Sequence, residues 1–180
     1  IAARFNIFPL KRELYHLALS YLYPRKSKRI LQFTKEVRSA PEFVQMEGKL
    51  REIFSNRPFQ VMVRSRTKGL GSYYNHFKRT LDLGNAENHV DFAIIIQSDS
   101  LLDCYSALGI VNTTFSPIPR SLRDFIANPK INGYRSLHVR VHENGQNYLV
   151  KIRTPDMDEW AMYGILREWD AQKPLSDEHW

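Results

Sequence analysis

Cysteine is almost absent from this sequence: Cys104 is the only one, which excludes an intramolecular disulfide and a zinc site built from several cysteines. No run of about 18 apolar residues is present either, so a membrane-spanning helix is excluded. The chain starts at Ile1 with neither an initiator methionine nor a signal-peptide pattern, and we expect a piece of a longer, cytoplasmic protein. What the 180 residues do contain is 43% hydrophobic and 12% aromatic side chains, enough to bury the core of about one domain.

The net charge of +7 is concentrated at one end of the chain. Residues 1–57 contain 12 Lys and Arg against 5 Asp and Glu, whereas residues 58–180 contain 14 of each kind. The densest basic run, residues 25–29, is short. Such a segment suits either the binding of a polyanion such as RNA or a solvated helical connector, and charge alone leaves both open.

The first third of the chain has the spacing of helices. Leucines at helical period predict a helix over 10–22, and Pro24 interrupts it before a second, basic helix over 27–37. A third helix is expected over 41–54, because Pro41 favours a first turn and apolar residues recur on one side.

Beyond residue 57 helical and strand patterns alternate. The alternating residues 59–64 predict a strand, and the apolar run 90–96 is typical of a strand covered on both faces. Residues 137–142 and 148–153 flank an Asn-Gly pair, which predicts a hairpin. Helices are expected at 70–80, 101–111 and 155–170, a turn at 84–88, and between 113 and 133 a loop with one short helix. The pattern predicts an α+β domain, a mixed β-sheet flanked by helices, with an N-terminal helical extension.

Two clusters could carry chemistry. Arg64, Arg66 and Lys68 lie where a strand gives way to a helix, which is a place that suits phosphate groups, although a solvated basic turn explains them equally well. The spacing of a P-loop is absent.

The second cluster is the turn at residues 128–138. Tyr134 could stack on a base and Asn132 could hydrogen-bond to its edge, while Lys130 and Arg135 could contact phosphates. The alternative is a turn whose tyrosine packs on the core.

Carboxylates are scarce where a metal would need them. Asp91 is the only acidic residue in 90–96, and 148–153 has none. Asp156, Asp158 and Glu159 cluster at a helix start, where the helix dipole favours acidic residues in any case. A zinc site is not expected, because His138 and His142 lack a third ligand at a matching spacing.

Several strings, taken together, resemble a known family. They are residues 102–110 (LDCYSALGI), 123–130 (RDFIANPK), 132–138 (NGYRSLH) and 152–154 (IRT). This order resembles the synthetase domain of the long RelA/SpoT proteins, which make and degrade the alarmone (p)ppGpp. The resemblance implies the nucleotidyltransferase-like synthetase fold over 58–170, a helical connector over 1–57 that follows a hydrolase domain, and a loosely held tail over 171–180.

The family transfers pyrophosphate from ATP to the ribose 3′-hydroxyl of GDP or GTP. The resemblance implies an ATP site at Arg66, Lys68 and Ser72, and a guanine-nucleotide site at Arg123, Lys130, Asn132, Tyr134, His138 and Arg153. In the guanine-nucleotide site Tyr134 would stack on the guanine, and Arg123 stands where the family usually has a lysine.

The departures from the family affect its catalytic positions. Aligning Ala93 with the family's strand puts Val90 at the Mg²⁺-binding aspartate, while Leu149 stands at the catalytic glutamate and Lys151 at a glutamine. A one-residue shift would offer Asp91 instead, but we expect that shift to point its neighbours to the wrong face. Transfer needs a metal and a base, so we expect no catalytic residues, no metal ligands and no cofactor.

The leading hypothesis is therefore a silent synthetase domain of a (p)ppGpp metabolism protein, with a structural, regulatory or nucleotide-sensing role. Its expected partners are the neighbouring hydrolase domain and a guanine nucleotide, and no membrane. The alternative is an active GTP pyrophosphokinase that uses Mg²⁺, Asp91, and either Asp156 or Glu159. A third hypothesis is contact with RNA or the ribosome through residues 1–57.

Overall fold

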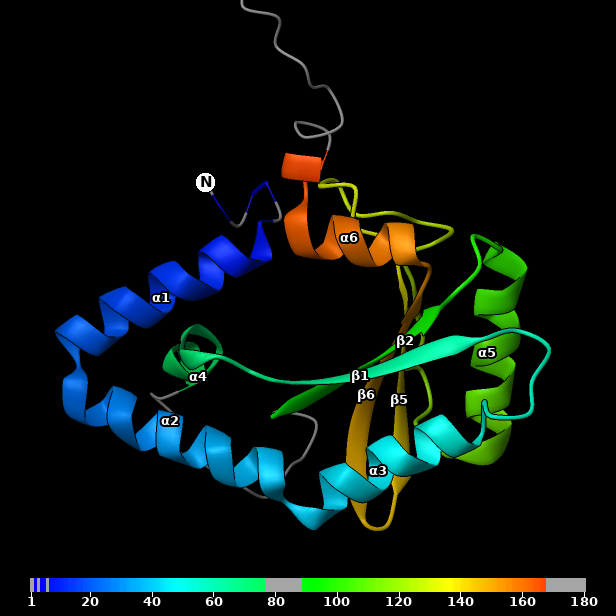
Figure 1. Cartoon of the computed structure of the whole chain (residues 1–180), viewed down its shortest axis with the longest axis horizontal. Helices are drawn as coiled ribbons and strands as arrows, with labels where there is room; N and C mark the ends of the chain where they lie inside the picture. Colours follow the sequence, from blue (N-terminus) through cyan, green and yellow to red (C-terminus); the bar gives the residue numbers. More distant parts are fainter. Residues whose placement is uncertain (1, 3, 6, 77–88, 168–180) are drawn as a thin grey trace, which may run out of the picture.

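The computed structural model describes residues 2, 4, 5, 7–76 and 89–167. Within them the elements, in chain order, are α1 (Phe8–Leu22), α2 (Pro24–Ser39), α3 (Pro41–Glu52), β1 (Val61–Thr67), α4 (Leu70–His76), β2 (Val90–Ile96), α5 (Leu101–Thr114), β3 (Ser116–Pro117), β4 (Arg123–Asp124), β5 (Leu137–Glu143), β6 (Gln146–Arg153) and α6 (Pro155–Tyr163). In Figure 1 α1, α2 and α3 form an arc, α4 lies inside this arc, and the sheet lies between the arc and α5.

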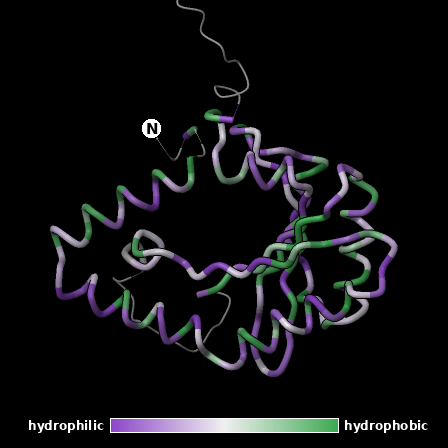
Figure 2. The backbone as a smooth tube through the Cα atoms, viewed as in Figure 1, coloured by the Kyte–Doolittle hydropathy of each residue, from purple (hydrophilic) through white to green (hydrophobic). Residues whose placement is uncertain are grey.

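Each of the three N-terminal helices has a proline in its first turn, where the missing N–H has no helical partner to lose. The three expected helices are confirmed. Helix α2 begins at Pro24, three residues earlier than expected, because the proline that separates it from α1 also starts it. Ile30, Phe33 and Val37 turn inward, and the basic side chains of α2 are exposed. Figure 2 shows the result: α2 is mostly hydrophilic with hydrophobic residues at intervals, while strand β2 is mostly hydrophobic.

The strands form one mixed sheet in the order β1-β2-β6-β5-β3, with β4 paired to β5 off this path. Strands β2 and β6 are parallel, and the other paired strands are antiparallel. The turn between β5 and β6 has φ of 49° at Asn144 and 75° at Gly145, the left-handed values that a two-residue hairpin turn requires. The expected sheet and hairpin are confirmed.

The side chains of strand β2 alternate between the two faces of the sheet. Its residues Val90, Phe92, Ile94 and Ile96 are at most 2% exposed and belong to a core that also includes side chains of α2, α3 and α5. Burying side chains of this size contributes roughly 1.5–3 kcal/mol each. Asp91, Ala93 and Ile95 point to the opposite face, against which α6 packs; we call it the α6 face. The expectation of a strand covered on both faces is confirmed.

Some elements differ from those expected. Strand β1 starts two residues late and continues to Thr67. The short helix expected between 113 and 133 is wrong: α5 runs to Thr114, and the segment instead contains β3, β4 and a turn in which Asp124 Oδ1 accepts the N–H groups of Ile126 and Ala127. Helix α6 ends at Tyr163 because Gly164 takes a φ of 54°, which ends the helical path.

Other expectations fall outside the described residues: the turn at 84–88, the helix beyond residue 76, and the tail at 171–180. Over 7–76 and 89–167, no helix combines the length and the apolar character needed to cross a bilayer.

Candidate functional site

The strand register brings charged residues from three strands together on the α6 face. Arg66 of β1 lies opposite Asp91 of β2, and Arg64 lies opposite Ala93. On its other side Ala93 is the partner of Lys151 of β6. Because side chains alternate along each strand, these residues share one face. We expected that the one-residue shift that offers Asp91 would point its neighbours to the wrong face. This expectation is wrong, because Asp91 shares this face with the basic residues and Val90 lies in the core.

Asp91 and Lys151 form an ion pair at the centre of this face. Lys151 Nζ lies 2.7 Å from Asp91 Oδ2, and the side chains are only 14% and 13% exposed. Burial acts to raise the pKa of Asp91, but Lys151, Lys68 and Arg66 outweigh it and lower that pKa. Burial also lowers the pKa of Lys151, with Arg66 and Arg153 lowering it further against the opposing effect of Asp91. The positive charge here exceeds what the carboxylate neutralises.

A second carboxylate on this face comes from helix α6. The hydroxyl of Thr154 accepts the N–H of Met157 at 3.4 Å and starts the helix, which places Asp158 over the strand ends. Asp158 binds Arg64 Nη1 at 3.0 Å and Arg153 Nη2 at 2.6 Å. Both side chains of this last pair are largely buried: Arg153 is 7% exposed and Asp158 is 11% exposed. Both carboxylates are thus held by basic side chains.

The donor set does not fit a magnesium ion. Mg²⁺ prefers several oxygen ligands in octahedral geometry. One oxygen of Asp91 is taken by Lys151, and the residue paired with Asp91 on β6 is Leu149, which offers no ligand. In the described residues no three His, Cys, Asp or Glu side chains group so as to hold a metal.

The residues that the resemblance implied for ATP lie beside helix α1. The guanidinium carbon of Arg66 is 3.9 Å from the ring centroid of Phe8, and Arg66 Nη1 lies 3.6 Å from Met162 Sδ. Ser72, at the start of α4, lines a cavity together with α1. Lys68 is near enough to Asp91 to lower its pKa. The three residues do gather in one region, but α1 packs against it.

Of the residues implied for a guanine nucleotide, Lys130, Asn132 and Tyr134 lie in one turn, His138 follows on β5, and Arg123 and Arg153 come from β4 and β6. The hydroxyl of Tyr134 and Nε2 of His138 are 2.8 Å apart, and the ammonium of Lys130 lies 5.1 Å from the Tyr134 ring centroid. Asn132 Oδ1 accepts the Tyr134 N–H at 3.3 Å, so this oxygen shapes the turn rather than facing a ligand. Arg123 is the register partner of His138 on β4 and is exposed.

Gly133 lets the turn pack against helix α6. Its φ is 76°, and a Cβ there would lie 2.8 Å from the ring of Trp160. The indole N–H of Trp160 donates to the carbonyl of Asn132 at 2.9 Å. Trp160 therefore ties the turn to the helix that also supplies Asp158.

Sequence reasoning missed several members of the site. Trp160, Phe8 and the pairing of Lys151 were not expected. For Lys151 a signal exists, since Lys151 and Arg153 share the two-residue spacing of Arg64 and Arg66. Cys104 is fully buried, and burial raises its pKa to about 11, so it has no thiolate to act as a nucleophile.

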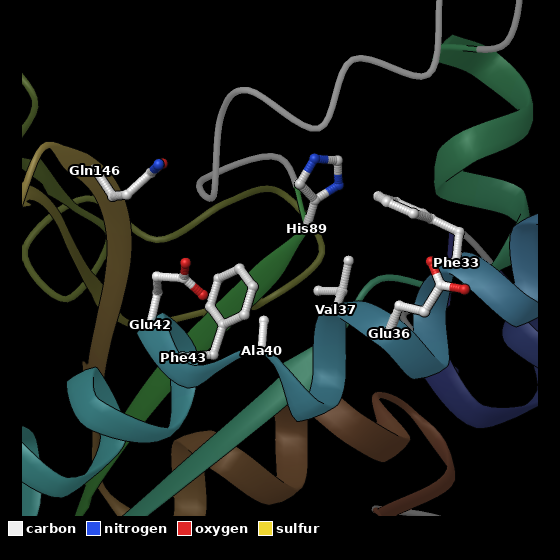
Figure 3. A pocket seen from close by; sticks show the side chains of 8 residues that line it. All are labelled: Phe33, Glu36, Val37, Ala40, Glu42, Phe43, His89 and Gln146. Carbon is white, nitrogen blue, oxygen red and sulfur yellow. The ribbon is translucent and has the colours of Figure 1, made fainter.

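A separate cavity of about 250 Å³ lies away from these residues, between α2, α3 and the starts of β2 and β6 (Figure 3). Among the residues that the structure describes, its walls include two carboxylates and no lysine or arginine: Phe33, Glu36, Val37, Ala40, Glu42, Phe43, His89 and Gln146. Phe43 also contacts Tyr148 on the core side of the sheet. This cavity does not suit a phosphate.

The state of His138 gives a pH-dependent prediction. Burial first, then Lys151, Lys130 and Arg153, lower its pKa to about 3, against Asp91, which raises it. The unfolded chain takes up this proton below its ordinary pKa of about 6.5. Stability is therefore complete above pH 6.5 and falls as the pH drops toward 3, by up to about 1.4 kcal/mol per pH unit. Urea unfolding at pH 7, 6 and 5 measures the free energy of unfolding of the wild type and of His138→Gln. This free energy should fall less steeply with decreasing pH in the variant; an equal dependence on pH in both proteins would contradict the assignment.

Comparisons with known proteins agree on one family. The family described as "Region found in RelA / SpoT proteins" matches residues 65–173. The chain is 36% identical over 177 residues to a GTP pyrophosphokinase of Haemophilus influenzae, and 34% identical over 174 residues to a guanosine-3′,5′-bis(diphosphate) 3′-pyrophosphohydrolase of Borreliella burgdorferi. These matches cover 94% of this chain but 23% and 26% of those proteins, so the chain spans about a quarter of their length.

Solved structures share the fold. Small alarmone synthetase 1 of Bacillus subtilis superposes with a TM-score of 0.53 at 21% identity, over 82% of this chain and 83% of that one. The same protein bound to its product pppGpp gives 0.52, over 84% and 85%. At this identity the likeness shows the architecture alone.

Proposed function

The chain belongs to the RelA/SpoT family of (p)ppGpp metabolism, and we propose that it is a catalytically silent synthetase domain that senses a guanine nucleotide. The relatives that it matches are far longer and carry hydrolase as well as pyrophosphokinase names. We place the domain beside a hydrolase domain of the same cytoplasmic chain. The boundaries at residues 57 and 170 remain predictions.

One observation supports the proposal that the domain is catalytically silent. The carboxylate of Asp91 is bound by the ammonium of Lys151, and the residue paired with Asp91 on β6 is Leu149. Pyrophosphate transfer from ATP would develop negative charge on a ribose oxygen and on the leaving phosphate. Stabilising that charge takes a metal ion, and accepting the proton takes a base. Lys151 supplies a fixed positive charge but neither a coordination site nor, while it is protonated, a base.

The active alternative meets a further obstacle. It needs Asp156 or Glu159 near Asp91, yet Arg167 forms ion pairs with both of them on the exposed side of α6. Asp158, the acidic residue of α6 that does reach the α6 face, is held between Arg64 and Arg153.

Support for nucleotide sensing comes from the turn around Tyr134 and from its neighbours. Arg153, Asp91 and Arg66 are close enough to shift the pKa of Tyr134, so an aromatic ring and basic side chains converge. Base and phosphate recognition use these groups. Arg66 also contacts Phe8, which lies in the expected connector, so the site and residues 1–57 are in direct contact.

We expect the purified 180-residue chain to make pppGpp from ATP and GTP with Mg²⁺ at least about 10⁴-fold more slowly than a pyrophosphokinase relative assayed beside it. The reason is that a metal ion and a base each contribute orders of magnitude to the rate. Calorimetry with GDP and GTP should show binding. Tyr134→Ala should weaken it about tenfold or more, given the worth of base stacking, while Tyr134→Phe should keep most of it.

Tyr21→Ala is the matched control, because Tyr21 is 86% exposed on α1. Synthesis at the rate of the relative would overturn the silent assignment. Binding that Tyr134→Ala leaves intact would overturn the guanine site. Contact of RNA or the ribosome with residues 1–57 stays a separate prediction, marked by affinity that falls steeply with salt.

A further inference from the structure

Trp160 contacts the turn around Tyr134, and it belongs to neither set of residues that the resemblance implied. Its indole N–H donates to the carbonyl of Asn132 at 2.9 Å. Its ring lies so close to Gly133 that a Cβ there would be 2.8 Å away. Both contacts are made with the main chain of the turn. Trp160 therefore limits where that backbone can lie, whichever side chains the turn carries.

The turn around Tyr134 is closed by its own backbone and anchored by its neighbours. The N–H of Lys130 donates to the carbonyl of Tyr134 at 3.1 Å, and the N–H of Gly133 donates to the carbonyl of Lys130 at 2.8 Å. The hydroxyl of Tyr134, 2.8 Å from His138 Nε2, anchors a side chain to β5. Trp160 anchors the backbone to α6. A binding turn that is fixed before its ligand arrives loses less entropy on binding.

Helix α6 connects this anchor to the N-terminal segment. Met162 Sδ lies 3.6 Å from Nη1 of Arg66, and Arg66 also contacts α1. Just beyond the helix, the N–H of Ile165 donates to the carbonyl of Phe5 at 3.2 Å. In Figure 1 the start of α1 lies next to the end of α6. One helix of nine residues thus contacts the turn through Trp160 and leads into the contact with the first residues of the chain.

We propose that Trp160 is a positioning residue, which holds the turn around Tyr134 ready for a guanine nucleotide and couples its occupancy to the contact between α6 and the N-terminal segment. A nucleotide that orders the turn also orders the indole bound to its backbone, and α6 with it. The coupling is reciprocal, so a change that loosens α6 weakens the binding of the nucleotide. This inference rests on the proposed guanine site, but it does not depend on whether the domain is catalytically silent.

Calorimetry of the full 180-residue chain with GTP tests the positioning role. Trp160→Phe keeps a ring but loses the N–H, and it should weaken GTP binding about fivefold, the usual worth of one hydrogen bond. Trp160→Ala loses the ring as well, and it should weaken binding at least about tenfold. The matched control is Tyr163→Phe, which removes one polar hydrogen from an exposed ring of the same helix and should leave binding unchanged. Urea unfolding shows whether each variant is folded.

Two further measurements test the coupling. In Trp169→Phe/Trp180→Phe, Trp160 is the one tryptophan left, and its fluorescence emission should change with GTP over the same concentrations as the calorimetric binding. Hydrogen exchange should show stronger protection of the Ile165 amide at saturating GTP, both in the wild type and in Tyr163→Phe. In Trp160→Phe at saturating GTP this gain should be lost, which a purely structural role of Trp160 would not cause.

The outcomes separate this inference from the proposed function. If the wild type binds no GTP, the proposed guanine site fails and this inference fails with it. If the wild type binds GTP and Trp160→Phe binds it equally well, the guanine site stands and the positioning role is overturned. An equal gain in the protection of Ile165 in Trp160→Phe and in the wild type would overturn the coupling.

Discussion

Exchanging Leu149 for glutamate and Lys151 for glutamine is expected to create a magnesium site that the wild type lacks. Position 149 is the parallel register partner of Asp91, so the new carboxylate would emerge beside it on the α6 face. Removing the ammonium at 151 frees Asp91 Oδ2, which it now holds at 2.7 Å. Two carboxylates are a common protein contribution to bound Mg²⁺. We expect at least about a hundredfold gain in affinity, measured by calorimetry with Mg²⁺ and by Mn²⁺ binding.

The control for this exchange is Leu149→Gln/Lys151→Gln, which has the same shape but one carboxylate fewer. Thermal unfolding gives a second measurement, because a ligand that binds only the folded state at about a hundred times its dissociation constant stabilises it by about 2.7 kcal/mol. The glutamate variant should therefore gain stability with Mg²⁺, and the wild type should not. Equal gains in the variant and its control, or none in either, would contradict the placement of Asp91 and position 149.

The fold was predictable from the sequence wherever a local pattern decides the structure. The run 90–96 is strand β2 to the residue, because seven residues of which only Asp91 is polar suit a strand covered on both sides. The Asn144-Gly145 pair takes the φ angles its chemistry favours. The secondary-structure predictions were wrong where a single side chain or a single backbone dihedral angle determines the local structure. Asp124 forms a turn where we expected a helix, and the positive φ of Gly164 ends α6 early.

The candidate site was predictable in its members but not in its arrangement. Tyr134 and His138 lie four residues apart in one turn, so their contact follows from local structure. The face on which Asp91 lies depends on the register of three strands from distant parts of the chain, which no local pattern encodes. The contact of Phe8 with Arg66 depends on how α1 packs on α4, and the sequence has only a faint sign of that in the small residues Gly69 and Gly71.

Asp91→Asn is expected to destabilise the fold strongly, by about 3–5 kcal/mol, because it leaves the buried ammonium of Lys151 without its partner. Arg66 and Arg153 already lower the pKa of Lys151, so losing the carboxylate leaves three neighbouring basic groups in a region of low exposure. Urea unfolding at pH 7 measures the loss.

The double variant Asp91→Asn/Lys151→Met should recover most of that stability, since replacing a buried ion pair by uncharged groups is often neutral. Lys151→Met alone should cost less than Asp91→Asn, because Arg66 and Lys68 still surround the carboxylate. This asymmetry distinguishes an ion pair in positive surroundings from an isolated one, in which the two single losses would be alike. Equal losses, or a double variant no more stable than Asp91→Asn, would show that Lys151 does not depend on Asp91. Lys151 would then no longer be the group that keeps Asp91 from a metal.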